Sequence, residues 1–394
     1  MENNIVTNES QNDEKKEEKK FKVDEEEIKL LEIIKNYFNG PNIDENNKIQ
    51  DISYENWVKK NQNIKKLCEI YEVEYSKEQS SIIDNSENNM IIPKKTFNSK
   101  DIFGFLENHD FACELKLLKW ITEDDNHKNK FIKIENKEKT KLNRFSDILP
   151  YEYNIVPIDI NNTNKTDINN YINASYITNP LDNKSKLFIA TQTPLENTIS
   201  SFWKMIYNHK IKLIIMLSNS SEEEKYKKYW PNTKEEILKF NDGDNSLNIE
   251  LIHKEEIAPQ IALLRKFKIN NELEVKQIQV ISWPEHGLLG EEYLVNMIFE
   301  KLLKNVNDQI KDNNIPVVVH CYDGVGRTGA LIAIILINMC LEKIKKIKKE
   351  PMMCVFNVIR KLREQRYSFV TDIEQYKYIY HFSLYWIKKN YPLE

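Results

Sequence analysis

The stretch VVVHCYDGVGRTG, residues 317–329, decides the fold and the chemistry expected of this chain. Its three valines predict a buried strand, and the apolar run that begins at Ala330 predicts a helix. The loop between them can curl so that successive backbone N–H groups point at one centre, and Gly324 and Gly326 supply the backbone freedom for this curl. We therefore expect a nest for an anion at the N-terminal end of the helix, where the helix dipole adds positive potential.

Two side chains of this loop carry reactive chemistry. Arg327 can hold two oxygens of a phosphate with its planar guanidinium, which lysine cannot imitate. The same positive field is expected to lower the pKa of Cys321 and to make it a thiolate nucleophile. The alternative is that Cys321 is a buried structural cysteine, but residue types at fixed offsets between a strand and a helix disfavour it. Zinc is a poor alternative because Cys340 and Cys354 form no ligand-like pair with Cys321, and we expect no metal or cofactor.

Length and composition limit the class of protein. The chain has 394 residues, 40% apolar and 30% charged, which fits one large globular domain with an extension. A net charge of -4 gives no field that would favour nucleic acid or an anionic membrane. The longest apolar stretch, residues 330–341, is too short to cross a bilayer, and the start of the chain lacks a secretory pattern. Five cysteines without paired close spacings argue for a reducing compartment, so we expect a soluble cytoplasmic protein, with a nuclear location as the alternative.

The chain divides into three parts. Residues 1–23 are expected to be a disordered tail because they have almost nothing to bury. Residues 24–99 form an extension, partly helical, in which residues 24–38 predict an amphipathic helix that docks on the main domain or, as the alternative, binds an unknown partner. Residues 100–394 form the main domain. The basic run 343–349 is expected to be a solvated helix end rather than a binding site for an anionic partner.

Within the main domain, short apolar runs alternate with helical patterns. The expected fold class is α/β or α+β, with a twisted mixed sheet flanked by helices. Strands are predicted at residues 187–190, 213–217, 277–282 and 316–319, and helices at residues 198–207, 293–306, 330–346 and 353–365.

The loop resembles the signature of the cysteine phosphatases, which is a cysteine, five residues, an arginine and a serine or threonine. Other segments narrow the resemblance to the tyrosine-specific protein phosphatases. These are NRFSD at 143–147, YINASYI at 171–177, ATQTP at 190–194 with FW at 202–203, YWP at 229–231, WPEHG at 283–287 and QY at 375–376. They occur in the order of the family and cover about residues 100 to 390. The resemblance implies the phosphatase fold, with its strand, phosphate loop and helix at the active site.

The resemblance also implies a mechanism in two steps. Cys321 attacks the phosphorus, Glu285 protonates the departing tyrosine oxygen, and water then hydrolyses the cysteinyl-phosphate. Arg327 and the loop amides stabilise the equatorial charge. Thr328 stabilises the departing thiolate, and His320 helps to fix the loop.

Substrate binding is implied at the mouth of the loop and along it. Phe145 stacks on the substrate ring and Asp147 holds the substrate backbone. Gln375 matches the second glutamine of the family and partly substitutes for the one that orients the hydrolytic water. The phosphate is implied to lie against the loop residues Tyr322, Asp323, Gly324, Val325, Gly326 and Arg327. The expected partners are phosphotyrosine-containing proteins.

Several positions depart from the family pattern. Glu285 replaces the usual aspartate, which moves the carboxyl group by about 1 Å, and such a displacement can cost about 100-fold in rate. Asp323 replaces the usual alanine and places a like charge in the nest, which raises the pKa of the thiol. Thr371 replaces the glutamine that usually orients water, Phe145 replaces a tyrosine, and Tyr322 replaces a small residue.

These departures keep competing functions open. The leading expectation is a tyrosine phosphatase whose turnover is reduced by Asp323, Glu285 and Thr371. The main alternative is a catalytically weak or inactive pseudophosphatase that binds phosphotyrosine or a partner protein. A dual-specificity or inositide phosphatase is a third possibility, against which the tyrosine-recognition segment at residues 143–147 argues.

Overall fold

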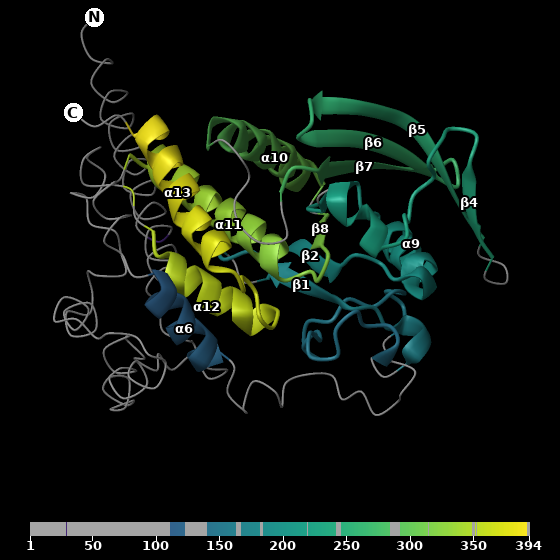
Figure 1. The fold of residues 1–394 in the computed structure, drawn as a ribbon, viewed down its shortest axis with the longest axis horizontal. Coiled ribbons are helices and arrows are strands. Elements are labelled where there is room, and N and C mark those ends of the chain that lie inside the picture. Colours follow the sequence, from purple (N-terminus) through teal and green to yellow (C-terminus); the bar gives the residue numbers. More distant parts are fainter. Residues whose placement is uncertain are drawn as a thin grey trace, which may run out of the picture.

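A computed structural model gives the fold of the chain. It describes residues 111–122, 140–162, 167–181, 184–218, 220–241, 246–283, 292–313, 315–348, 351 and 353–391, together with Lys29. The described residues form one twisted sheet with helices packed on both faces (Figure 1). The expectations for residues 1–23 and for the helix at 24–38 fall almost wholly outside the described residues.

The sheet has eight strands in the order β1-β2-β8-β3-β7-β6-β5-β4. Their bounds are β1 Ala174–Thr178, β2 Lys186–Gln192, β3 Leu213–Met216, β4 Ile237–Phe240, β5 Leu247–Ala258, β6 Ala262–Ile269, β7 Leu273–Val280 and β8 Val317–Cys321. Strands β2, β8, β3 and β7 are parallel and central, while the pairings toward both edges are antiparallel. The carboxyl end of β8, which carries Cys321, therefore lies between two parallel neighbours. This edge of a parallel sheet is where ligands of such folds usually bind.

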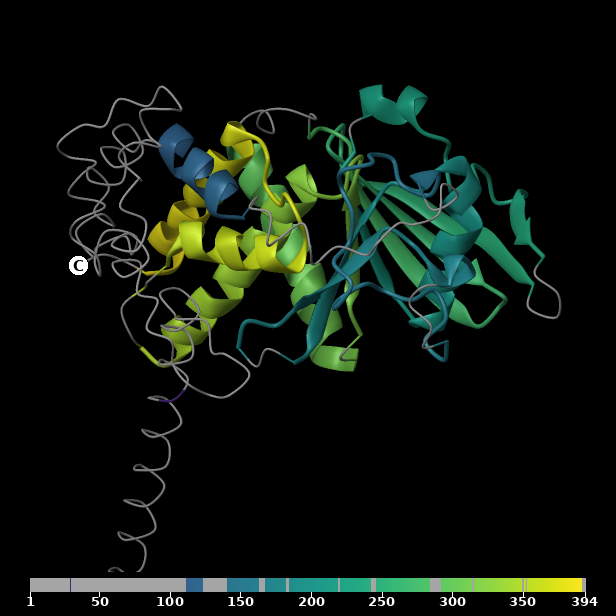
Figure 2. The ribbon, with the colours of Figure 1, turned by 90° about the horizontal axis from the view of Figure 1, so that it is seen from below.

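Helices cover the two faces unequally. On one face lie α6 Phe111–Thr122, α10 Glu292–Asn313, α11 Gly326–Lys346, α12 Val355–Gln365 and α13 Ile373–Asn390. Helix α9 Ile199–Asn208 packs on the other face. Figure 2 shows the helical layer on one side of the sheet, with α6 against α12 and α13. Three short 3-10 helices complete the described elements: η2 Ile168–Asn170, η3 Glu196–Thr198 and η4 Ser220–Lys225.

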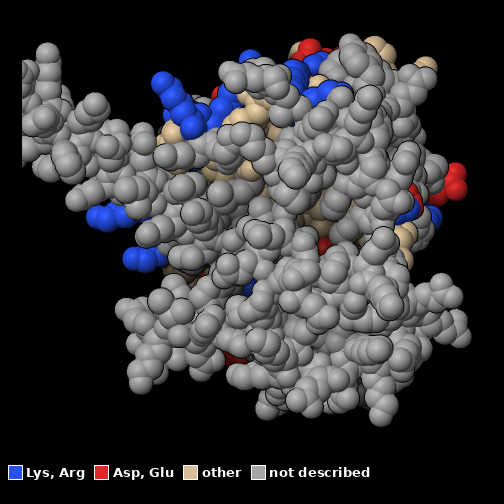
Figure 3. Space-filling model, turned by 90° about the vertical axis from the view of Figure 1, so that its left-hand side faces the viewer, with Lys and Arg blue, Asp and Glu red and all other residues tan. Residues whose placement is uncertain are grey.

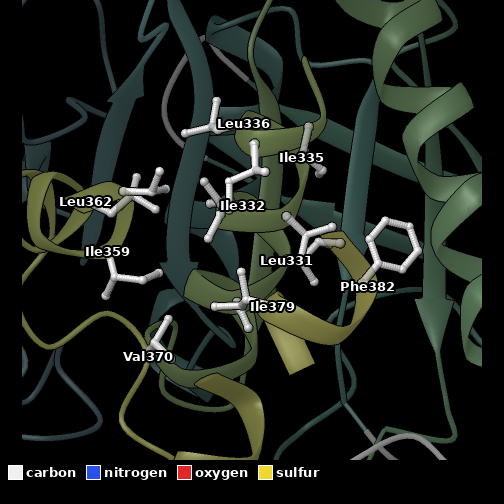
Figure 4. Packing of buried hydrophobic residues seen from close by; sticks show 14 of the residues in the cluster. Leu331, Ile332, Ile335, Leu336, Ile359, Leu362, Val370, Ile379 and Phe382 are labelled. Atoms are coloured by element: carbon white, nitrogen blue, oxygen red, sulfur yellow. The ribbon is translucent and has the colours of Figure 1, made fainter. Parts of the chain in front are cut away.

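Helix α11 forms the centre of the larger core. It is buried around its whole circumference because β-strands lie on one side of it and α12 and α13 on the other. Figure 4 shows Leu331 and Ile335 of α11 near Phe382 of α13, and Leu362 of α12 on the opposite side of α11. The loop that precedes α11 is thus anchored at both ends by buried structure.

Most predicted elements are confirmed, with two kinds of difference. The strands predicted at 187–190, 213–217 and 316–319 lie in β2, β3 and β8, whereas β7 begins earlier than predicted and ends at Val280. The four predicted helices are confirmed as α9, α10, α11 and α12. Strands β4, β5 and β6 had not been predicted, because charged residues interrupt their apolar alternation, and helix α13 had not been predicted either. The two asparagines between β6 and β7 were a sequence signal for a hairpin turn. In the structure Asn270 and Asn271 adopt the positive φ values, 50° and 59°, that such turns require.

The surface of the helical layer carries basic side chains. Lys343, Lys345, Lys346 and Lys348 near the end of α11 are exposed, as expected of a solvated helix end. In Figure 3, which views the side of the helical layer, basic side chains lie at separate places near the margins, with acidic ones among them.

No helix in the described part of the chain is long and apolar enough to cross a membrane.

Candidate active site

The loop of residues 322–325 joins β8 to α11 in a tight curve. Its bend requires glycine at position 324, where φ is 76° and an added Cβ would lie 2.4 Å from the carbonyl group of Thr191. Thr193 N donates to the carbonyl oxygen of Cys321 at 2.9 Å, which fixes the start of the loop to the end of β2. The predicted strand, loop and helix are thus confirmed, with α11 beginning at Gly326.

The thiol of Cys321 lies at the base of this loop with 1% of the residue exposed. The hydroxyl of Thr328, in the first turn of α11, donates a hydrogen bond to Sγ at 3.1 Å. A hydroxyl donor at this position favours the thiolate form of the sulfur.

The carboxylate of Asp323 occupies part of the anion nest. Its Oδ1 accepts hydrogen bonds from the backbone N–H groups of Val325 at 2.9 Å and Gly326 at 3.3 Å. The same oxygen accepts a hydrogen bond from the Cys321 thiol at 3.0 Å. The loop amides that were expected to face a phosphate therefore already hold an anion of the protein.

This arrangement sets the protonation of the nucleophile. Burial raises the pKa of Cys321 to about 12, and the negative charge of Asp323 adds to this effect. Arg327 and the hydroxyl of Thr328 act in the opposite direction but do not prevail. The prediction that the field of the loop lowers the pKa of Cys321 is therefore wrong for this state of the loop.

Arg327 is held by a partner that the sequence did not indicate. Its Nη1 and Nη2 donate to the two carboxylate oxygens of Glu222, each at 2.8 Å, and Nη1 also donates to the carbonyl oxygen of Trp283 at 2.9 Å. Arg327 is 2% exposed and Glu222 3% exposed. A bidentate pair fixes the plane of the guanidinium, which a phosphate must meet in a defined orientation. Glu222 lies in η4 among three consecutive glutamates, and no sequence signal separates it from its neighbours.

A second arginine supports the back of the loop. Arg366, which is fully buried, donates from Nε to the carbonyl oxygen of Gly324 at 2.8 Å. Its other nitrogens donate to Ser175 Oγ at 3.1 Å and Asn173 Oδ1 at 2.8 Å, so it connects the loop to the start of β1. The sequence analysis did not identify Arg366, because its role depends on a contact 42 residues away along the chain.

His320 lies behind the nucleophile and is fully buried. Its ring lies within hydrogen-bond distance of the hydroxyls of Thr193 at 3.2 Å and Tyr229 at 2.7 Å. Burial lowers the pKa of His320 to about 3, so the ring is neutral at physiological pH.

Aromatic side chains line the mouth of the loop. Phe145 is 38% exposed and meets the ring of Tyr322 edge to face, with centroids 6.1 Å apart. The guanidinium of Arg144 lies 4.2 Å from the centroid of the same ring. Asp147, two residues after Phe145, is also exposed. An exposed ring and a carboxylate separated by one residue are available to an incoming peptide.

The remaining predicted residues divide into two groups. Gln375, in the first turn of α13, and Thr371 lie beside the start of α11, where a Cβ on Gly326 would be 3.0 Å from Gln375 Oε1 and 3.5 Å from Thr371 Oγ1. Glu285 falls outside the described residues, which end at Trp283 before resuming in α10. Within the described ranges, no group of three or more His, Cys, Asp or Glu side chains is arranged to hold a metal ion.

A comparison with family models agrees with this geometry. The model described as protein-tyrosine phosphatase matches residues 139–385, which is more than half of the chain. The chain belongs to the protein-tyrosine phosphatase family. The resemblance inferred from its motifs is therefore confirmed.

Curated relatives within this family are receptor and non-receptor enzymes. Receptor-type tyrosine-protein phosphatase C of Homo sapiens is 34% identical over 236 residues, which cover 59% of this chain and 17% of that protein. Tyrosine-protein phosphatase non-receptor type 12 of Homo sapiens is 31% identical over 249 residues, which cover 62% of this chain and 30% of that protein. The chain thus spans less than a third of the length of these two relatives.

Solved structures of the family share the fold. The catalytic domain of human protein tyrosine phosphatase non-receptor type 18 matches with a TM-score of 0.60 at 23% identity, over 75% of this chain and 99% of that chain. A structure of PTPN18 in complex with HER2-pY1196 phosphor-peptides matches with a TM-score of 0.61 at 24% identity, over 74% of this chain and 97% of that chain. The expected phosphatase fold, a mixed sheet flanked by helices, is confirmed.

Proposed function

We propose that this chain hydrolyses phosphotyrosine in proteins through a cysteinyl-phosphate at Cys321. The observation that carries the proposal is the arrangement of the phosphate loop. The buried thiol of Cys321 accepts a hydrogen bond from the hydroxyl of Thr328 in the first turn of α11. Arg327 lies in the same turn, and Glu222 of η4 orients its guanidinium. These groups are a nucleophile, a donor for its thiolate and a fork for phosphate oxygens.

In the first chemical step, the Cys321 thiolate attacks phosphorus in line and the bond to the tyrosine oxygen breaks. Arg327 and the backbone N–H groups of the loop stabilise the charge on the equatorial oxygens. Glu285 gives a proton to the departing tyrosine oxygen, in the role that its position in the WPEHG segment implies.

In the second step, water attacks the cysteinyl-phosphate and the sulfur departs as a thiolate. The hydroxyl of Thr328 stabilises that thiolate, because it already donates to Sγ in the resting loop. Gln375 lies beside Gly326 at the entrance of α11, which supports its proposed role in orienting the water. Thr371 is next to it and is too short to reach as far as a glutamine.

Asp323 makes this enzyme slow in its resting state. A phosphate dianion must compete with the Asp323 carboxylate for the N–H groups of Val325 and Gly326. Two unit charges about 6 Å apart repel by about 3 kcal/mol at an effective dielectric constant of about 20. This competition between phosphate and Asp323 lowers turnover, although Cys321, Arg327 and Thr328 are all present.

The proposed substrates are phosphotyrosine-containing proteins. The exposed Phe145 ring and the edge of Tyr322 form an aromatic rim around a deeply buried thiol, so a long phosphotyrosine reaches Cys321 more easily than a phosphoserine does. The complex of the related PTPN18 with phosphopeptides supports this assignment. We further propose that the catalytic domain covers residues 100–394 and acts in signalling in a reducing compartment such as the cytoplasm, where Cys321 stays a thiol.

The test is phosphate release from a phosphotyrosyl peptide by the purified chain, with Cys321→Ser as the blank. Release above the blank is expected, and the same assay on a phosphothreonyl peptide and an inositol phosphate should give much lower rates. Absence of release would overturn the proposal. If Cys321→Ser and the unaltered chain then bound the peptide equally, the protein would be a phosphotyrosine-binding pseudophosphatase.

A further inference from the structure

A line of buried polar side chains leads from the middle of the sheet to the phosphate loop. It begins at Arg265 on β6, continues through Gln277 on β7 and Tyr229, and ends at His320, the residue before the nucleophile. All four residues are at most 4% exposed. Buried polar groups of this kind have to satisfy one another, so the direction of each hydrogen bond can be worked out.

The direction is set at Arg265, because a guanidinium can only donate. Its Nη1 donates to Gln277 Oε1 at 2.9 Å and to Gln279 Oε1 at 2.8 Å, so both amide oxygens must face it. The amide nitrogen of Gln277 consequently faces Tyr229 and donates to its hydroxyl oxygen at 2.7 Å. Tyr229 has a single hydrogen to donate, and its hydroxyl oxygen lies 2.7 Å from His320 Nε2 and 4.0 Å from Met216 Sδ, so the much shorter contact to nitrogen takes the hydrogen.

The tautomer of His320 follows from this direction. Nε2 accepts the hydrogen of Tyr229, so the proton of the neutral ring is on Nδ1. Nδ1 faces the hydroxyl oxygen of Thr193 at 3.2 Å. Thr193 in turn donates its hydroxyl to the carbonyl oxygen of Cys321 at 2.9 Å.

We infer that Arg265, acting through Gln277 and Tyr229, holds His320 as the neutral Nδ1–H tautomer and thereby positions the backbone of Cys321. Arg265 and Gln277 are positioning residues, since they act on the loop only through other side chains. The inference about the tautomer stands apart from the proposed phosphatase activity, and only its effect on turnover rests on that proposal.

The first test is ¹⁵N NMR of the full chain labelled at histidine, with the His320 resonances assigned by their absence from His320→Asn. We expect one pyrrole-like nitrogen, Nδ1, and one imine-like nitrogen, Nε2, without change across the pH range in which free histidine titrates. A proton on Nε2, or a doubly protonated ring in this range, would overturn the inference.

The second test reverses the line of hydrogen bonds at its second member. Gln277→Glu keeps the size of the side chain and its acceptor for Arg265, but it turns the donor toward Tyr229 into an acceptor. Tyr229 then donates to the carboxylate, and His320 Nε2 must donate to Tyr229. We expect Nε2 to become protonated, and kcat to fall by about 10-fold, the lower end of the effect of supporting partners at other sites.

Gln279→Glu is the matched control. It places the same charge against Arg265, but the amide nitrogen of Gln279 donates to the carbonyl oxygen of Ser218 and not to Tyr229. The His320 tautomer should remain that of the unaltered chain. A shift of the tautomer in Gln279→Glu equal to that in Gln277→Glu would overturn the inference, because it would show a general effect of charge.

Two further outcomes are separable. If Gln277→Glu changes the tautomer while the unaltered chain releases no phosphate, the inference is supported and the proposed function fails. If Gln277→Glu does not fold, Tyr229→Phe replaces it. That variant removes only the donor to Nε2, so the Nε2 resonance should move toward that of a free imine nitrogen while Nδ1 stays protonated, and an unmoved Nε2 resonance would overturn the inference.

Discussion

Cys321 donates a hydrogen bond to the carboxylate of Asp323, two residues later in the same loop, over an Sγ–Oδ1 distance of 3.0 Å. The same carboxylate oxygen holds the N–H groups of Val325 and Gly326. The loop expected to bind a phosphate dianion thus carries an anion of its own, whose charge adds to the effect of burial in raising the pKa of the Cys321 thiol. The first prediction tests this contact directly.

Asp323→Ala should raise kcat/KM on a phosphotyrosyl peptide at neutral pH. A thiol pKa lower by about one to two makes about 10-fold to 100-fold more thiolate. The pH dependence has a definite sign, because the thiolate forms as the proton leaves. With a pKa raised to about 12, alkylation of Cys321 by iodoacetamide should keep accelerating with pH well above neutrality, and in Asp323→Ala the rise should come at lower pH.

Asp323→Asn separates charge from occupancy of the nest. It keeps a carbonyl oxygen for the two loop N–H groups and removes the charge. A gain in kcat/KM in both variants would show that the charge of Asp323 slows the reaction. A gain in Asp323→Ala alone would show that the side chain slows it by occupying the loop N–H groups. Identical alkylation profiles in all three proteins would contradict the role assigned to Asp323.

Glu285→Asp should raise kcat if the glutamate is the general acid and its carboxyl group is displaced by the extra methylene. The gain is bounded by the effect of a misplacement of about 1 Å, which is about 100-fold. Steady-state kinetics on a phosphotyrosyl peptide measure the gain, and Glu285→Gln, which has no proton to give to the departing oxygen, should lower kcat. Unchanged kcat in Glu285→Gln would remove Glu285 from the mechanism.

Glu222→Gln should weaken both the fold and the phosphate site. It leaves the buried Arg327 without its carboxylate partner, and breaking a buried pair typically costs about 3 kcal/mol or more. Urea unfolding should show this loss, and KM for the phosphopeptide should rise because the guanidinium plane is no longer fixed.

Glu224→Gln is the control for this pair, because Glu224 lies on the same 3-10 helix and is exposed. Removing its charge should change neither unfolding nor KM appreciably. Equal losses in the two variants would mean that η4 acts through its overall charge and not through the contact with Arg327.

Arg366→Met should destabilise the phosphate loop. The substitution leaves three buried acceptors without their donor, on Gly324, Ser175 and Asn173, at a cost of about 1 kcal/mol or more for each. Arg360→Met removes a partly buried ion pair with Glu364 nearby in the sequence and should cost less than 1 kcal/mol. The two free energies of unfolding, measured in urea, should differ by at least about 2 kcal/mol, and similar values would contradict the role of Arg366.

Residues 317–329 were enough to predict the site because the reactive side chains lie close together along the chain. A strand, a glycine-bearing loop and a helix in direct succession place Cys321, Arg327 and Thr328 around one centre whatever the rest of the chain does. Helices α10, α11 and α12 were also predicted, since apolar residues at a helical period have to be buried, whereas α13 was not. Strands β4 to β6 escaped prediction because charged residues interrupt their apolar alternation on an antiparallel sheet, where only pairing with neighbours identifies a strand.

By itself, the sequence determined the family and the fold class, and it singled out Cys321 and Arg327 as the proposed nucleophile and the proposed phosphate-binding arginine. Only the tertiary structure decided which of three adjacent glutamates orients Arg327, which arginine supports Gly324, and where the carboxylate of Asp323 points. The physical reason is that the pKa of a buried thiol depends on distances of a few ångströms to charges and donors. Asp323 could have turned to solvent and left Cys321 to the field of the helix, and the folded loop instead hydrogen-bonds the carboxylate to the thiol and to two backbone N–H groups.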